Sequence, residues 1–456
     1  MKRREKLSSR LGFILLSAGC AIGLGNVWKF PYVAGQYGGG VFLILYFIML
    51  IFFGIPIMTM EFAIGRAAQK APVRMYDDLE PKGTKWHIHG YVGLFGCILL
   101  MMYYPVVAGW IVRYFIMYLC GSLEGVVPDT AGAEFEAMLA SPFINIFYTA
   151  IVVAISFAVC AMGLQKGLER ITKYLMAALL LIMVVLAINS FTLEGSREGL
   201  KFFLFPDIDR AREIGFTRVI MGALNQAFFT LSVGVGSMAV FGSYIGRERS
   251  LFGESMSVTL LDTFVAVTAG LIMFPACFSY GIDVNTGPAL LFITMPGVFS
   301  NMSCGRLWGA LFFLFMAFAA FTTAFGVFEG IIANFMELTG FTRKKICLIC
   351  GIGMFILALP CALGFNVLSG ITPFGEGTFI LDLEDFIESN LILPTGALVY
   401  VCFCTAKIGW GWDSFIREAN QGEGIKMPVW LKNYMKYFVP LLLILVIVFG
   451  IRDFLR

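Results

Sequence analysis

Long apolar runs dominate the chain and recur at nearly regular intervals. A helix needs about 20 apolar residues to cross the hydrocarbon core of a bilayer. Residues 41–60 and 143–164 reach this length without a charged residue. The pattern predicts an all-α polytopic membrane protein with eleven transmembrane helices, near residues 11–30, 41–65, 90–119, 143–164, 168–191, 217–245, 255–281, 306–335, 346–364, 387–407 and 436–451.

Composition supports a membrane protein and excludes some other classes. Hydrophobic residues make up 59% of the 456 and charged residues 14%, whereas soluble domains carry about 25% charged residues. We therefore expect lipid to be the solvent for most of the outer surface. A net charge of +3 is too small to indicate a nucleic-acid partner.

The distribution of Lys and Arg predicts the orientation in the cell membrane. Basic residues are concentrated before the first span, between the second and third, and in every second loop after that, whereas the loop at 120–142 is acidic. Because cytoplasmic loops carry an excess of Lys and Arg, we expect a cytoplasmic N-terminus. An odd number of spans then places the C-terminus outside.

The first span contains residues that propagate a helix poorly. Gly19, Gly23, Gly25 and Asn26 fall within eight positions at its centre. Two interpretations are open, because Gly19 and Gly23 also have the GxxxG spacing of a helix-packing face. The alternative is a helix broken in the middle of the membrane.

A second glycine-rich segment at 230–236 in the sixth span favours the break. Two interrupted helices five spans apart predict an inverted repeat of five helices plus five, with halves at 1–191 and 217–407 and an additional span at 436–451. Such a pair marks the binding site of secondary transporters. The free N–H groups of one half-helix suit a carboxylate, and the free carbonyls of another suit an ammonium or Na⁺.

Polar residues inside other spans could face the same site. Asp262 lies within the seventh span, and an intramembrane carboxylate indicates function unless another helix supplies a partner. Thr322 and Thr323 lie deep in the eighth span, where either could instead bond to its own helix. Tyr104 offers a hydroxyl in the third span.

Two strings carry a resemblance to a known family. They are RLG at 10–12 continuing to GLGNVWKFPY at 23–32, and QAFFTLSVGVG at 226–236. With these the chain resembles, over nearly its whole length, the neurotransmitter:sodium symporter family and its prokaryotic amino-acid transporters of eleven spans. The resemblance implies the leucine-transporter-like fold, with broken helices 1 and 6.

The family resemblance implies two sodium sites and one substrate site, and no organic cofactor. The first sodium site would use Asn26, Thr230, Asp262, the Ala21 carbonyl and the substrate carboxylate. The second would use the carbonyls of Gly19, Ile22 and Ala319 with the hydroxyls of Thr322 and Thr323. The substrate carboxylate would contact Leu24, Gly25 and Tyr104, its ammonium Ala21, Phe229, Thr230 and Ser232, and its side chain Cys20, Leu100, Phe229, Val235, Thr323 and Val327.

The implied side-chain lining is apolar and predicts a hydrophobic L-amino acid as substrate. Val235 stands where the leucine transporter has a larger Phe, so we expect room for aromatic side chains. At the first sodium site, Asp262 replaces the family's usual Asn or Ser, and Ala266 stands where some members carry a Glu. A fixed carboxylate could itself balance the sodium charge, which predicts chloride-independent transport.

The resemblance also implies two gates. Lys29 stands at the outer gate, where Arg is usual, with Asp385 as its expected partner. A Lys offers a point charge instead of a bidentate fork. The inner gate would involve Arg4, Ser243, Tyr244 and Glu337; Arg4 could pair with Glu337 or remain solvated.

These features together predict sodium-coupled symport by alternating access, without covalent chemistry. A non-transporting amino-acid sensor or a channel using the same site is the alternative. A channel needs a continuous polar pore, for which the spans carry few polar residues. We do not expect an enzyme, because the spans offer no nucleophile–base pair or metal-ligand cluster.

Overall fold

The computed structural model describes residues 5–123, 128–281 and 290–454, which fold as helices. Within these residues, nine continuous helical segments are long and apolar enough to cross a membrane. A tenth is a pair, Arg10–Ala21 and Gly25–Gln36, bent by 54°. The helical pair Phe216–Thr230 and Ser237–Gly242 occupies the predicted sixth span. The predicted membrane-spanning architecture is therefore confirmed, with helices at all eleven expected positions.

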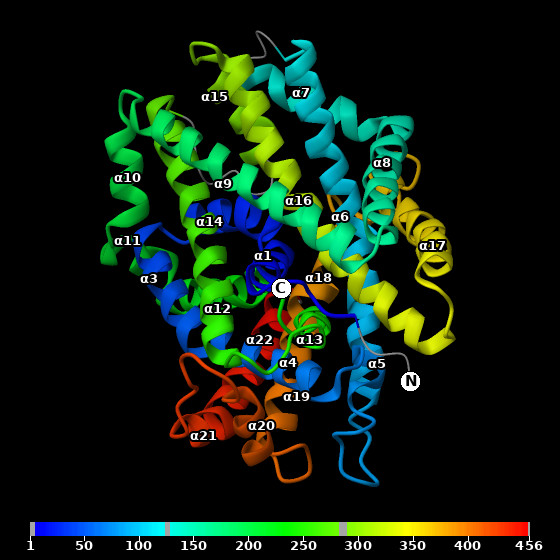
Figure 1. Ribbon diagram of the computed structural model, residues 1–456. Helices are drawn as coiled ribbons and strands as arrows, with labels where there is room; N and C mark the ends of the chain where they lie inside the picture. Colours follow the sequence, from blue (N-terminus) through cyan, green and yellow to red (C-terminus); the bar gives the residue numbers. More distant parts are fainter. Residues whose placement is uncertain (1–4, 124–127, 282–289, 455–456) are drawn as a thin grey trace.

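Figure 1 shows how the helices surround the centre of the molecule. In chain order they are α1 (Arg10–Ala21), α2 (Phe30–Gln36), α3 (Gly40–Met49), α4 (Ile55–Ala68), α5 (Pro72–Met75), α6 (Ile88–Cys120), α7 (Pro128–Ala140), α8 (Pro142–Ala161), α9 (Arg170–Phe191), α10 (Ser196–Leu204), α11 (Ile208–Ile214), α12 (Phe216–Thr230), α13 (Ser237–Gly242), α14 (Leu251–Ser279), α15 (Met295–Ser300), α16 (Gly305–Thr339), α17 (Arg343–Leu363), α18 (Ile380–Phe386), α19 (Leu393–Thr405), α20 (Trp412–Ala419), α21 (Leu431–Asn433) and α22 (Val439–Phe454).

Six wider helical turns join or extend these helices, at Gly25–Lys29, Leu50–Gly54, Leu164–Glu169, Leu290–Thr294, Ile387–Ile392 and Tyr434–Phe438. All but the third are followed two residues later by a proline. Proline lacks the backbone N–H and clashes with the preceding turn of a helix. In a membrane the freed carbonyls need new partners, and a local widening of the helix supplies them.

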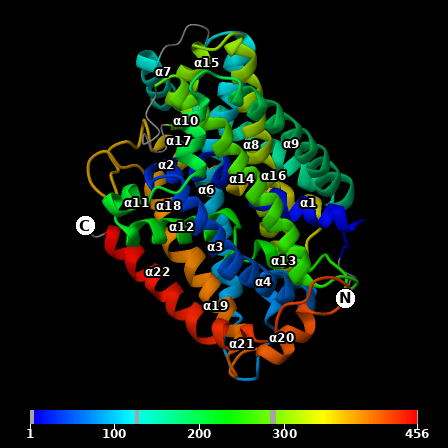
Figure 2. The same ribbon diagram turned by 90° about the vertical axis from the view of Figure 1, so that its left-hand side faces the viewer.

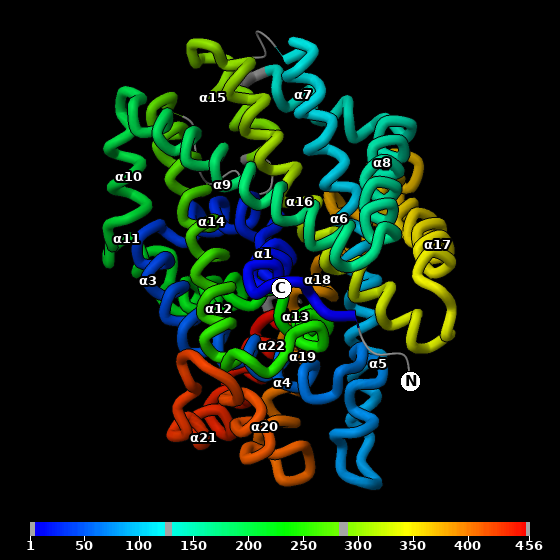
Figure 3. Tube along the Cα trace, viewed as in Figure 1, coloured from blue at the N-terminus to red at the C-terminus, as the bar shows by residue number. Residues whose placement is uncertain are grey.

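The two breaks lie in the middle of the bundle. Helix α1 contacts α9, α13, α14 and α16, and Figure 3 shows its trace at the centre of the view, next to α13. Gly19 allows this close packing, because a Cβ there would lie 3.0 Å from Thr172 Cγ2 and 3.2 Å from Thr322 Cβ. Both interpretations of the first span therefore hold. Gly19 lies at a helix-packing contact, and Gly23 lies in the break of the helix.

Large apolar side chains cover the outside of the bundle. Leu260, Phe143 and Leu181 are 73%, 74% and 67% exposed, as expected where lipid and not water is the solvent. Helix α1 begins and α22 ends on opposite sides of the molecule, as Figure 2 shows.

Candidate functional site

The first break leaves backbone groups of α1 without helical partners. Helix α1 ends at Ala21, and Ile22 follows with an extended backbone, φ −73° and ψ 91°. The chain becomes helical again near Gly25. A Cβ on Gly23 would lie 2.3 Å from Thr323 Oγ1 and 2.8 Å from Tyr104 Oη. Glycine at this position therefore lets two hydroxyls approach the bare backbone of the break.

The second break, at 231–236, contains three residues with positive φ: Ser232 (50°), Gly234 (112°) and Gly236 (85°). A Cβ on Gly234 would lie 2.2 Å from the carbonyl oxygen of Leu393, so only glycine fits this close approach to α19. The Gly234 N–H donates to the Glu61 carboxylate. Glu61, which is fully buried in α4, thus holds the irregular backbone in place.

A buried polar cluster joins the two breaks to α14. Asn26 Nδ2 donates to Asp262 Oδ1 at 2.8 Å and to the Asp262 carbonyl at 3.1 Å. Thr230 Oγ1 donates to Asp262 Oδ2 at 3.2 Å. All three side chains are fully buried, and no cationic side chain in the described part of the chain pairs with Asp262. The structure thus brings the three predicted side chains of the first sodium site together.

The chemistry of this cluster suits a hard cation. A buried carboxylate is costly unless a cation or several hydrogen bonds compensate it, and here only neutral groups surround it. Carboxylate, amide and hydroxyl oxygens are the ligands that small hard cations prefer. The residues present therefore fit a sodium ion, which would supply the missing positive charge beside Asp262.

The second predicted ion cluster lies between α1 and α16. Thr323 Oγ1 donates to the carbonyl oxygens of Gly19 at 3.2 Å and Ile22 at 3.1 Å. Thr322 Oγ1 donates to the Ala319 carbonyl at 3.0 Å. Gly19, Ile22, Ala319, Thr322 and Thr323 are thus brought together, and all of them supply uncharged oxygens.

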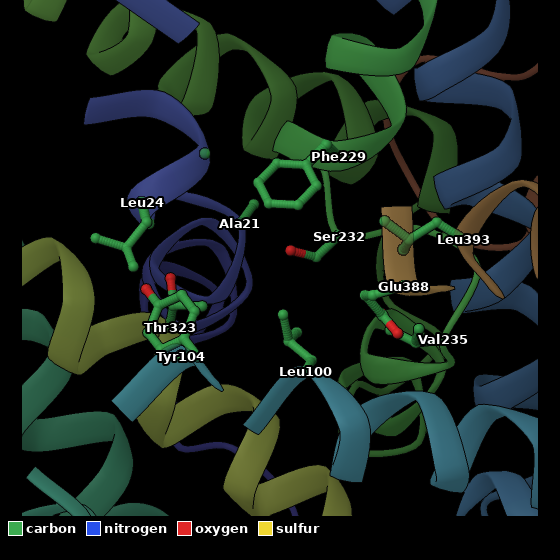
Figure 4. A pocket seen from close by; sticks show the side chains of 12 residues that line it. Ala21, Leu24, Leu100, Tyr104, Phe229, Ser232, Val235, Thr323, Glu388 and Leu393 are labelled. Atoms are coloured by element: carbon green, nitrogen blue, oxygen red, sulfur yellow. The ribbon is translucent and has the colours of Figure 1, made fainter. Parts of the chain in front are cut away.

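A pocket opens between the two breaks, α6 and α16. Its lining comprises Ala21, Gly23, Leu24, Gly25, Leu100, Tyr104, Phe229, Ser232, Val235, Thr323, Glu388 and Leu393. Figure 4 shows Ser232 near the middle, with Leu24 and Tyr104 on one side and Val235, Glu388 and Leu393 on the other. The Phe229 ring covers Gly25, where a Cβ would lie 2.9 Å from Phe229 Cδ1.

Most of the predicted substrate residues line this pocket, but Cys20, Thr230 and Val327 do not. Cys20 points at α16 instead, where a Cβ on Gly326 would lie 2.6 Å from its Cβ. Thr230 is engaged by Asp262, and Val327 is fully buried.

Two lining residues on the tenth span, Glu388 and Leu393, were missed. The prediction of an apolar side-chain lining is wrong at Glu388, whose carboxyl group belongs to the lining.

The expected outer pair is formed above the pocket. Lys29 Nζ lies 3.5 Å from Asp385 Oδ2 and donates to Ser389 Oγ at 3.2 Å. The same ammonium lies 3.9 Å from the centre of the Phe229 ring. Tyr103 donates to the other oxygen of Asp385 at 3.2 Å. Lys29 therefore links the acidic end of the tenth span to an aromatic wall of the pocket.

Contacts on the inner side involve three of the predicted gate residues and, in addition, Glu329 and Arg343. Arg4 lies outside the described residues. Tyr244 Oη donates to Glu329 Oε1 at 2.7 Å. Arg343 forms a bidentate ion pair with Glu329, from Nη1 to Oε2 at 2.6 Å and from Nη2 to Oε1 at 2.8 Å. Glu337 accepts from the Ala71 N–H at 2.7 Å. Ser243 Oγ donates to its own helix, at the Val240 carbonyl.

A further inner contact fixes the start of α1. Glu169, 1% exposed, accepts from Ser8 N at 2.9 Å, Ser8 Oγ at 2.6 Å and Lys173 Nζ at 2.8 Å. A Cβ on Gly12 would overlap this carboxylate, at 1.9 Å from Oε1. This contact could not be predicted from sequence, because Ser8 and Glu169 are 161 residues apart.

Comparisons with known proteins agree with this architecture. The model of the sodium:neurotransmitter symporter family matches residues 4–131 and 143–456. The sodium-dependent transporter YhdH of Bacillus subtilis (strain 168), itself uncharacterized, is 35% identical over 442 residues, 96% of each chain. The sodium- and chloride-dependent taurine transporter of Bos taurus is 26% identical, over 96% of this chain and 77% of that one.

A solved structure extends the likeness to three dimensions. The crystal structure of MhsT in complex with L-phenylalanine superimposes with a TM-score of 0.87 at 35% identity, covering 98% of this chain and 99% of that one.

Proposed function

Because the chain belongs to the sodium:neurotransmitter symporter family, we propose that it imports hydrophobic and aromatic L-amino acids with sodium by alternating access. It is a multi-pass, sodium-dependent membrane transporter with the leucine-transporter-like fold, and not an enzyme. The observation that carries the substrate proposal is the pocket between two broken helices, next to a buried carboxylate without a cationic partner among the described side chains.

The pocket offers distinct places for the parts of an amino acid. Backbone N–H groups at Leu24 and Gly25, with Tyr104, would bind the carboxylate, because they begin a half-helix. Carbonyls at the ends of α1 and α12, with Ser232, would bind the ammonium. Leu100, Phe229 and Val235 would enclose the side chain. The phenylalanine bound to MhsT supports a substrate of this class.

Two sodium ions would bind next to the substrate. The first would be held by Asn26, Thr230 and Asp262, with the Ala21 carbonyl and the substrate carboxylate, so that ion and substrate stabilise one another. The second would be held between α1 and α16, by the oxygens of the Thr322–Thr323 cluster described above. Neither site needs an organic cofactor.

Transport is expected to be independent of chloride. Asp262 supplies a fixed negative charge at the first sodium site, and the fully buried Ala266 stands one helical turn away. The bovine relative is named as sodium- and chloride-dependent, so this property varies among similar proteins. Replacing chloride by gluconate should leave the initial uptake rate unchanged, and uptake abolished by gluconate would contradict this assignment.

Alternating access would open the pocket on one side at a time. The Lys29–Asp385 pair would close the outside, and the contacts of Tyr244, Glu329 and Arg343 the inside. The N-terminus would be cytoplasmic and the C-terminus extracellular, with residues 1–191 and 217–407 as two inverted halves and 436–451 as an additional span.

A sodium-gradient uptake screen in proteoliposomes tests the proposal. Each of the twenty amino acids is supplied in labelled form, with external sodium and then with potassium instead. We expect accumulation above equilibrium for Leu, Met, Phe, Tyr and Trp, with sodium only. Equilibration without accumulation would indicate a channel, and binding without flux would indicate a sensor; either result would overturn symport.

A further inference from the structure

Glu388 places a carboxyl group in a pocket whose other side-chain walls are mostly apolar. The residue lines the pocket and is 0% exposed. Neither of its carboxyl oxygens has a hydrogen-bond partner among the described residues. The nearest cation of the outer gate, Lys29, is already engaged by Asp385 and Ser389.

The group lies at the end of the pocket that a substrate side chain would reach. In Figure 4, Glu388 is next to Val235 and opposite Leu24 and Tyr104, which lie at the proposed carboxylate end. A Cβ on Gly96 would lie 3.0 Å from Val235 Cγ1 and 3.6 Å from Glu388 Oε2. The same Cβ would meet Ile392 Cγ2 at 2.7 Å, so glycine at this position allows α6 to pack closely beside Val235 and this carboxyl group.

A buried carboxyl group without a partner is unfavourable in either protonation state. An ionised one has lost its hydration, and a neutral one still has a donor and acceptors to satisfy. Buried side chains of this kind almost always have a partner in folded proteins. Since the described protein offers Glu388 none, the partner belongs to the molecule that fills the pocket.

The remaining walls define what that partner is attached to. Leu100, Phe229, Val235 and Leu393 require an apolar body, and Glu388 requires an N–H or O–H donor at its far end. We propose that Glu388 binds the phenol or indole donor of an aromatic amino acid, so that the transporter selects Tyr and Trp over Phe. This specificity rests on the proposed function and adds to it.

The physical basis of the selection is the cost of an unpaired group. A site built to hydrogen-bond a substrate hydroxyl discriminates strongly against the analogue without it, because its own polar group then stays buried and unpaired. Phenylalanine fits the apolar walls but leaves Glu388 without a partner. We therefore expect at least about tenfold preference for Tyr over Phe, and for Trp over 1-methyltryptophan, whose ring nitrogen carries no hydrogen.

The test is competition against sodium-dependent uptake of labelled leucine, with Tyr, Phe, Trp, 1-methyltryptophan and Lys as competitors. Wild type is compared with Glu388→Leu and Glu388→Gln. Glu384→Gln is the matched control, because Glu384 is also buried, four residues earlier on the same span, but does not line the pocket. In Glu388→Leu the Tyr-to-Phe ratio should fall to about one. It should survive in Glu384→Gln, and partly in Glu388→Gln, whose amide oxygen still accepts.

Several results would overturn the inference. One is equal inhibition by Tyr and Phe in wild type, and another is a Tyr-to-Phe ratio that is unchanged in Glu388→Leu. Lys as the best competitor would also contradict it. An equal loss of inhibition by all competitors in Glu388→Gln would instead assign Glu388 to the ammonium group that all of them share. The comparison of Trp with 1-methyltryptophan needs no variant, so it stands even where Glu388→Leu does not fold. Leucine uptake that is absent or sodium-independent in wild type would instead refute the proposed function.

Discussion

Replacing Asp262 by Asn should weaken sodium binding while leaving the cluster's shape nearly intact. The amide is isosteric with the carboxylate. Its oxygen can still accept from Asn26 Nδ2, and its NH2 group then takes the place of Oδ2 and would donate to Thr230 Oγ1. What is lost is the only negative side chain in this cluster. Two unit charges about 4 Å apart attract by about 4 kcal/mol at an effective dielectric constant of about 20.

The net effect is smaller than this attraction, because the variant no longer has to bury a carboxylate. We expect a net loss of about 1.4–2.8 kcal/mol, which raises the sodium concentration for half-maximal uptake by about 10–100-fold. The assay is initial leucine uptake against external sodium at constant ionic strength. Asp413→Asn is the matched control, because the Asp413 side chain is 87% exposed and, among the described residues, pairs with Lys432 alone, at 3.4 Å. An unchanged sodium dependence in Asp262→Asn would refute the charge-balance reasoning.

Three further predictions concern the gates and the second break. Lys29→Gln removes an ion pair whose side chains are only 20% and 35% exposed, and the cation–π contact with Phe229. Substrate should dissociate about 5–30-fold faster in a filter-binding chase, and an unchanged rate would exclude this gate. Glu169→Gln loses the charge-assisted hydrogen bonds to Ser8. Hydrogen exchange of the backbone amides at residues 5–12 should accelerate by at least about tenfold, and an unchanged exchange rate would mean that other contacts hold this segment. Gly234→Ala places a Cβ 2.2 Å from the Leu393 carbonyl oxygen at a residue with positive φ. The purified protein should lose about 1–3 kcal/mol of stability and its thermal midpoint should fall, whereas Gly353→Ala, which meets no neighbour, should leave the midpoint unchanged.

The membrane architecture was predictable from sequence because hydropathy acts over about twenty residues at a time. Each predicted span coincides with a helix, and both breaks fall at the glycine clusters. The tenth span was misjudged at its start: 387 was predicted, but the helix begins at Ile380. Asp382, Glu384 and Asp385 resemble a polar loop, yet they extend the helix beyond the apolar run.

That boundary explains why Glu388 was missed. Glu388 is the second residue of the span predicted at 387–407, whereas the observed helix begins seven residues earlier and carries Glu388 into the pocket. Cys20 and Val327 lie outside the pocket lining for a related reason. Neighbouring helical positions point in different directions, and the rotation of a helix depends on packing that no single segment encodes. The Glu169–Ser8 and Glu329–Arg343 contacts depend on tertiary structure in the same way.

The central claim is that a sodium gradient drives amino-acid accumulation through the pocket between the two breaks. The most direct measurement is labelled leucine uptake into proteoliposomes with sodium outside and potassium gluconate inside, for wild type and Asp262→Asn. The account predicts a transient overshoot for wild type that sodium ionophores abolish, and a much smaller one for the variant at the same sodium concentration. Uptake that only reaches equilibrium, or an equal overshoot in Asp262→Asn, would contradict it.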